Sequence, residues 1–101
     1  MSVTEIARLR DEIADVDKEI VNLVAKRFQL AAQVGLEKKL LGLPLRDEGT
    51  EELVRTRFRE ECATRGISAS FSGGLARLLI GESLRRQKQV RGPQSRGGGA
   101  P

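Results

Sequence analysis

A regular apolar stripe in the first third of the chain most constrains what it can fold into. Successive apolar residues there are separated by three, four, three, four, three, seven and four positions. The stripe consists of Ile6, Leu9, Ile13, Val16, Ile20, Leu23, Leu30 and Val34. Because helical residues three or four apart share a face, the pattern predicts one continuous amphipathic helix. Thr4 suits its N-cap, and Gly42 and Pro44 limit its other end, so the predicted helix covers about residues 4–41.

The length of this helix has a consequence for assembly. A helix over residues 4–41 is about 55 Å long. A compact domain of 101 residues has a radius of gyration of only about 13 Å. The helix therefore extends beyond its own domain, and its apolar stripe stays exposed unless a partner covers it. A second copy of the chain is the simplest partner, so we predict an intertwined homodimer.

Two shorter helices are predicted to follow. The second begins near Asp47, which suits an N-cap, and ends at Gly66. Its predicted inner face consists of Leu53, Val54, Phe58 and Cys62. The third opens around Ser68 or Ser70 and runs to about Val90. Its core candidates are Leu75, Leu78, Leu79 and Ile80. The predicted fold class is all-α, a three-helix chain with a very long first helix.

The composition narrows the class of protein. Residues 1–90 are predicted to form the helical domain, and the glycine-rich residues 91–101 a disordered tail. The net charge of +4 permits a nucleic-acid module built on the basic residues 85–91. Only 3% of the residues are aromatic, so few side chains could stack on nucleic-acid bases, and no nucleic-acid partner is expected. No apolar run reaches the length of a membrane span, and the polar amino terminus is unlike a signal peptide.

Cysteine and histidine usage limits the chemistry. Cys62 is the only cysteine and histidine is absent, so a structural zinc site and an intramolecular disulfide are both excluded. An unpaired thiol fits a reducing cytosol, and the protein is predicted to be cytoplasmic. The sequence has no phosphate-binding glycine-rich loop, no metal cluster and no nucleophile with a base. An enzyme of this kind would need no cofactor and would depend on positioning and electrostatics.

Arg27 stands in the stripe where the next apolar residue belongs. A guanidinium removed from water needs an anion, which could be a glutamate across the dimer or a ligand. Lys38 lies eleven residues later, which leaves a rotation of only about 20° and a rise of about 16 Å. The two cations therefore share a face and could bracket a small anionic ligand. Arg10 is rotated by about 260° from Arg27 and could reach only a partner chain's pocket.

Polar pairs also occur on the two shorter helices. Ser83 and Gln87 are four apart and share one face of the third helix. Asp47 and Glu51 are likewise four apart at the start of the second helix. Both acids have a structural alternative, because carboxylates at a helix start cap it or interact with its dipole.

The residues together resemble the all-helical class of chorismate mutase over about residues 4–90. The matching segments are Leu9-Arg10, Asp17 to Leu23 with Ala25-Lys26-Arg27, Val34-Gly35 with Lys38, Pro44-Leu45-Arg46-Asp47, Glu51, and Ile80-Gly81-Glu82-Ser83 with Gln87. The resemblance implies an intertwined dimer whose active sites each include an arginine from the other subunit. It also implies the rearrangement of chorismate to prephenate in aromatic amino-acid biosynthesis, without proton transfer, covalent intermediate or cofactor.

The resemblance further implies how the cations act. Arg27 would clamp one carboxylate of chorismate, and the partner's Arg10 would hold the second. This clamping favours the folded, reactive conformer of the substrate. Lys38 and Gln87 would donate to the ether oxygen, which gains negative charge as its C–O bond breaks.

The resemblance also implies roles for the acids and hydroxyls of the two shorter helices. Glu51 would accept from the ring hydroxyl, and Asp47 and Ser83 would complete the pocket wall. Thr50 stands where the family commonly has arginine, so its backbone would serve the substrate.

Pyruvate lyases acting on isochorismate share the fold and a similar arginine pair, which makes that reaction an enzymatic alternative. The alternative from another class is a helical interaction or nucleic-acid module without catalysis.

Overall fold

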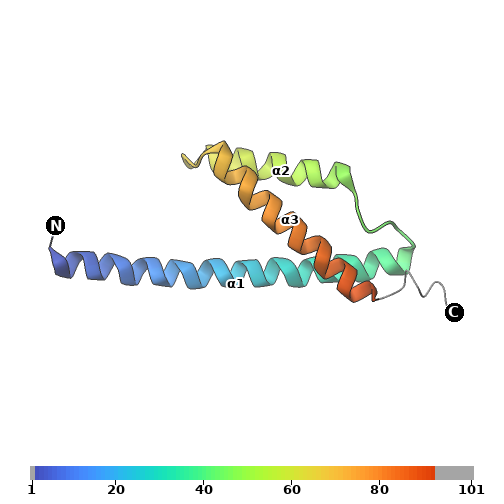
Figure 1. The fold of residues 1–101 in the computed structure, drawn as a ribbon, viewed down its shortest axis with the longest axis horizontal. Helices are drawn as coiled ribbons and strands as arrows, with labels where there is room; N and C mark the ends of the chain where they lie inside the picture. Colours follow the sequence, from blue (N-terminus) through green and yellow to red (C-terminus); the bar gives the residue numbers. More distant parts are fainter. Residues whose placement is uncertain (1, 93–101) are drawn as a thin grey trace.

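The computed structural model describes residues 2–92, which form three α-helices (Figure 1). Helix α1 spans Val3–Leu41, α2 spans Glu48–Ala63 and α3 spans Ala69–Arg91. No strand occurs over residues 2–92, so the predicted all-α class is confirmed. Helix α3 continues one residue beyond its predicted end, and residues 93–101 of the predicted tail lie outside the described part of the chain.

The ends of α1 are set by local hydrogen bonding. Ser2, and not Thr4 as predicted, is the N-cap, and its Oγ accepts from the backbone N–H of Glu5 at 3.0 Å. Thr4 lies inside the helix because Ser2 offers the same hydroxyl two residues earlier. Gly42 ends the helix with a φ of 70°, a left-handed conformation that glycine adopts without steric cost. The predicted C-terminal limit of this helix is therefore confirmed.

The caps of the other two helices match the sequence pattern. Asp47 caps α2, and its Oδ1 accepts from the backbone N–H of Thr50 at 3.0 Å. Gly66 closes the turn that follows α2, with a φ of 74°. Ser68, one of the two predicted candidates, caps α3, and its Oγ accepts from the N–H of Phe71 at 3.1 Å.

Helix α3 lies between the other two helices in the packing of the chain. It packs against both α1 and α2, whereas α1 and α2 scarcely touch each other (Figure 1). The buried apolar residues are Ala31, Cys62, Ala76 and Leu79. Leu53 and Leu78 were predicted to face inward, but each is 68% exposed. Those two predictions are wrong for the single chain because no further helix layer covers their side of α2 or α3.

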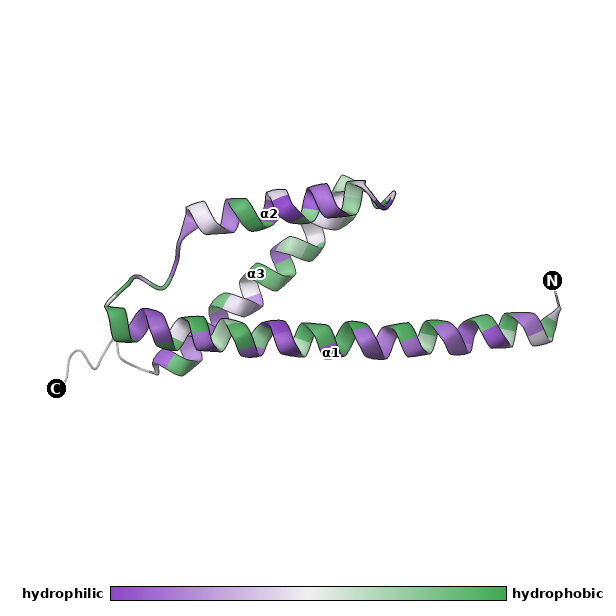
Figure 2. Ribbon diagram, turned by 180° about the vertical axis from the view of Figure 1, so that it is seen from behind, coloured by the Kyte–Doolittle hydropathy of each residue, from purple (hydrophilic) through white to green (hydrophobic). Residues whose placement is uncertain are grey.

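The apolar stripe of α1 is largely uncovered. The chain measures 67 × 24 × 16 Å and has a Cα radius of gyration of 18.4 Å, well above the value of about 13 Å for a compact domain. Apolar bands recur along the whole of α1, including the half that extends past α2 and α3 (Figure 2). In that half Ile13, Val16, Ile20 and Leu23 are between 51% and 67% exposed.

No helix of the part of the chain that the structure describes is both long enough and apolar enough to cross a membrane.

Gly35 lets α1 and α3 approach closely. A Cβ at this position would lie 2.8 Å from Cα of Gln87 and 2.9 Å from Cγ2 of Val90. The obstacle at Gln87 is backbone, so the helices themselves would have to separate. We expect Gly35→Ala to lower the free energy of unfolding by about 1–3 kcal/mol in urea denaturation, as overpacked cores do.

Gly73 provides the matched control for this substitution. It lies within α3, and a Cβ there would meet nothing within 4 Å. Alanine favours a helix interior over glycine by about 1 kcal/mol, so Gly73→Ala should raise the urea midpoint. A Gly35→Ala midpoint equal to or above that of the unmodified protein would show that the close approach at Gly35 does not limit stability.

Candidate active site

A cavity of about 420 Å³ lies where α3 faces both α1 and the start of α2. Its lining consists of Arg27, Leu30, Ala31, Val34, Lys38, Asp47, Thr50, Glu51, Val54, Ile80, Ser83, Leu84 and Gln87. Small-molecule sites in proteins have volumes of about 300–1,000 Å³, and this cavity falls within that range. Every residue predicted for the site lines it except Arg10. Arg27 and Lys38 therefore do share a pocket, as their spacing along α1 predicted.

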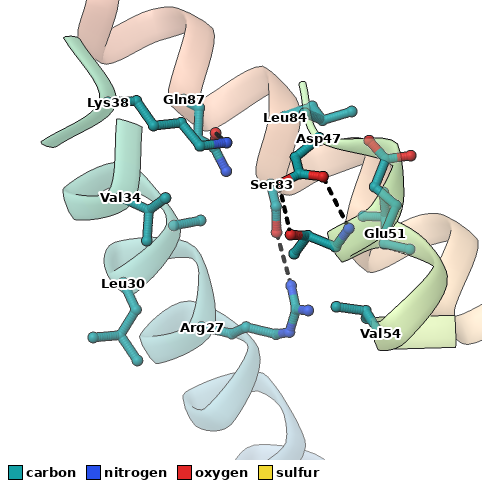
Figure 3. A pocket seen from close by; sticks show the side chains of 13 residues that line it. Arg27, Leu30, Val34, Lys38, Asp47, Glu51, Val54, Ser83, Leu84 and Gln87 are labelled. Carbon is teal, nitrogen blue, oxygen red and sulfur yellow. Dashed lines mark hydrogen bonds between the residues drawn. The ribbon is translucent and has the colours of Figure 1, made fainter. Parts of the chain in front are cut away.

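Arg27 points from α1 across the cavity toward α3 (Figure 3). Its guanidinium is half-buried, lies over the Phe58 ring, and donates from NH1 to Oγ of Ser83 at 2.8 Å. No carboxylate within residues 2–92 pairs with it. Burial lowers the pKa of Arg27, and the positive charge of Arg57 lowers it further. Since arginine stays charged at neutral pH, the position favours an added anion.

Lys38 and Gln87 form a donor pair at one end of the cavity (Figure 3). The ammonium donates to Oε1 of Gln87 at 3.0 Å and to the backbone carbonyl of Leu45 at 2.6 Å. Because an ammonium only donates, the amide oxygen must face it, and the amide NH2 is left with its two donors. A third N–H of Lys38 is also left. The pair can therefore donate from both side chains to one acceptor in the cavity.

The side chains of Asp47 and Thr50 are hydrogen-bonded to each other at the start of α2. Oδ2 of Asp47 accepts from the Thr50 hydroxyl at 2.9 Å, in addition to the capping bond from the Thr50 backbone. The backbone bond, and then the hydroxyl bond, holds the pKa of Asp47 below its usual value. Thr50 thus supports the helix cap at a position where the resemblance leads one to expect an arginine.

Glu51 is buried in the cavity wall and is bound by Arg46, which lies in a segment that carries the family resemblance but was assigned no role from sequence. Arg46 donates from Nε to Oε2 of Glu51 at 2.9 Å and from NH2 to Oε1 at 3.0 Å. The signal available in the sequence was spacing: Arg46 immediately precedes the cap of α2, from where a long side chain can reach Glu51 in the first turn. Many surface arginines precede helices, so the spacing alone would not have singled it out.

Arg10 does not reach the cavity of its own chain. It lies on the exposed, extended half of α1, seventeen residues before Arg27 and so about 25 Å away along the helix axis. No arginine side chain spans that distance. Any role of Arg10 at such a cavity would therefore have to be at that of another chain.

The walls of the cavity differ in chemical character. Arg27 and Lys38 supply positive charge from α1, and apolar side chains from all three helices separate the polar groups. Such a cavity suits a small molecule with an apolar centre and more than one anionic or hydrogen-bonding group. No group of three or more potential metal-ligating side chains occurs over residues 2–92.

Comparisons with known proteins agree on one family. The family model described as chorismate mutase type II matches residues 9–88. The chorismate mutase of Methanocaldococcus jannaschii is 29% identical over 87 residues, which cover 86% of this chain and 88% of the relative. The 4-amino-4-deoxychorismate mutase of Streptomyces venezuelae is 29% identical over 91 residues, covering 90% and 88%.

A longer relative matches over part of its length. The T-protein of Enterobacter agglomerans is 35% identical over 81 residues, which cover 80% of this chain but 22% of that protein. No solved structure matches the chain.

Proposed function

Because the chain belongs to the chorismate mutase type II family, we propose that it rearranges chorismate to prephenate within the cavity between its helices. The reaction belongs to aromatic amino-acid biosynthesis, and it breaks a C–O bond while a C–C bond forms. The observation that carries the assignment of the site is the Lys38–Gln87 donor pair, in the same cavity as an Arg27 that has no carboxylate partner in the described chain.

Arg27 is proposed to bind one of the two carboxylates of chorismate. Its guanidinium is already directed into the cavity by the 2.8 Å bond to Ser83. A planar guanidinium holds a carboxylate through two parallel bonds, which fixes its orientation as well as its position. Holding the substrate in its compact conformer removes part of the entropy cost of the rearrangement.

Lys38 and Gln87 are proposed to act on the ether oxygen. This oxygen gains negative charge as the C–O bond breaks, and both side chains have donors left for it. The bonds of Lys38 to Gln87 and to the Leu45 carbonyl hold the pair in place before the substrate arrives. Donors oriented in advance stabilise the transition state more than the ground state, which is the requirement for catalysis.

Three residues at the start of α2 and one on α3 are proposed to complete the site. Glu51 accepts from the ring hydroxyl, Asp47 and Ser83 form part of the wall, and Thr50 contributes its backbone. The support for these roles is the position of all four in the cavity lining and the burial of Glu51.

The second carboxylate is proposed to be bound by the partner's Arg10 in a homodimer. The support is physical: the apolar stripe of α1 is half-exposed over the stretch from Ile13 to Leu23, and an apolar surface of this length is unfavourable in water. We expect sedimentation at micromolar concentration to give twice the chain mass of 11.1 kDa. A monodisperse monomer would contradict the dimer.

Mixing two inactive variants tests whether the sites are shared. In a hybrid of Arg10→Ala and Arg27→Ala chains, one site has lost both arginines and the other keeps both. Random exchange of subunits makes half of the dimers hybrids, so about a quarter of the unmodified activity should return after co-refolding. No recovery from a mixture that sediments as dimers would contradict a shared site.

A direct assay tests the function itself. We expect the purified chain to convert chorismate to prephenate without added metal or cofactor. The same preparation should be offered isochorismate. Pyruvate release from isochorismate, without prephenate formation from chorismate, would replace the mutase by a lyase.

A further inference from the structure

The ion pair between Arg46 and Glu51 differs from the others in the described chain. Two parallel bonds of 2.9 and 3.0 Å join the guanidinium to the carboxylate. The side chain of Arg46 is 60% exposed, whereas that of Glu51 is 9% exposed and lines the cavity. The arginine therefore approaches from the solvent side and places its positive charge next to a carboxylate that lines the cavity.

The neighbouring pair of Arg55 and Glu52 shows the contrast. Both of these side chains are exposed, on the surface of the same helix, and Glu52 does not line the cavity. Such surface pairs have little energetic effect. The Arg46–Glu51 pair, by contrast, offsets the negative charge that Glu51 would otherwise bring to the cavity wall.

The charge at Glu51 matters for one substituent of the substrate. In the proposed function Glu51 accepts from the ring hydroxyl of chorismate. A relative that is 29% identical to this chain is named for 4-amino-4-deoxychorismate, in which an amino group replaces that hydroxyl. An aliphatic amine is protonated at neutral pH, so the two substrates differ by one positive charge at the point where Glu51 makes contact.

We propose that Arg46 determines substrate preference in this cavity by neutralising Glu51, so that a hydroxyl is favoured over an ammonium group. This inference rests on the proposed function and adds a residue that does not itself touch the substrate. A lone carboxylate attracts an ammonium strongly. The guanidinium next to it repels the ammonium and leaves hydrogen-bond acceptance by Glu51 largely intact, since each carboxylate oxygen has a further lone pair.

The size of the effect follows from Coulomb's law. Two positive charges about 6 Å apart, at an effective dielectric constant of about 20, discriminate by about 100-fold. Arg46 is exposed and partly screened by solvent, which reduces this to about tenfold.

The test compares both substrates on the same variants. The ratio of kcat/KM for 4-amino-4-deoxychorismate to that for chorismate is measured for the unmodified protein, Arg46→Gln, Arg46→Lys and Arg55→Gln. Because the fraction of folded enzyme cancels in this ratio, a purely structural effect of the substitution does not move it. Where the amino compound is not turned over, its inhibition constant against chorismate is compared with KM for chorismate.

We expect Arg46→Gln to raise the ratio about tenfold, because the opposing charge is lost. Arg46→Lys keeps the charge and should stay within about threefold of the unmodified protein, as should the control Arg55→Gln. A ratio in Arg46→Gln within threefold of the unmodified value, or the same rise in Arg55→Gln, would overturn the role of Arg46 while leaving the mutase intact. An unmodified protein without mutase activity would overturn both.

Discussion

Replacing Arg27 by alanine is expected to lower kcat/KM for chorismate about a thousandfold, which corresponds to about 4 kcal/mol of transition-state stabilisation. The substitution removes the guanidinium that Ser83 directs into the cavity. No carboxylate in the described part of the chain pairs with Arg27, so we expect the substitution to lower the free energy of unfolding only slightly. Steady-state kinetics with purified protein, together with circular dichroism and sedimentation, separates loss of activity from loss of structure.

Lys26 and a second replacement at position 27 provide the controls. Lys26 is the adjacent residue of α1 and is exposed, outside the cavity lining. Lys26→Ala should keep its activity within about twofold, as surface substitutions do. Arg27→Lys retains a charge without the planar fork and should recover only part of the lost rate. Full activity in Arg27→Ala would refute the proposed carboxylate clamp.

Replacing Lys38 by alanine is expected to lower kcat by about 100- to 1,000-fold, with a smaller change in KM. The ammonium acts on an oxygen whose charge grows only in the transition state, so its loss should appear mainly in kcat. The substitution also frees the amide oxygen of Gln87, which then has no fixed orientation. Measuring kcat and KM separately, across a range of chorismate concentrations, is therefore essential.

Lys39 is the matched control for Lys38. It is the next residue of α1, is exposed, and donates to the backbone carbonyl of Arg91 at 3.4 Å, away from the cavity. Lys39→Ala should leave kcat unchanged within about twofold. A Lys38→Ala enzyme whose loss lay entirely in KM would show that the ammonium binds the ground state and transition state equally, against the proposed role.

The structure explains why some predictions from sequence failed. Both Ser2 and Thr4 carry a hydroxyl suited to an N-cap, and only the backbone geometry distinguishes them. Leu53 and Leu78 fit the helical spacing of an inner face, but spacing alone does not say how many helix layers surround a face. In each case the local pattern was correctly identified as helical, and the error concerned what lies next to it.

The sequence by itself determined the features that depend on near neighbours. Helix periodicity, the cap at Asp47 and the termination at Gly42 follow from bonds within a few residues. At the start of the third helix the sequence left Ser68 and Ser70 as candidates, and the structure shows that Ser68 is the cap. The shared face of Arg27 and Lys38 follows from helix geometry in the same way.

Only the tertiary structure decided which polar groups meet. Gln87 is 49 residues from Lys38, and Ser83 is 56 residues from Arg27. Contacts at such separations depend on how closely α3 packs on α1, which Gly35 permits, and no local pattern encodes that distance.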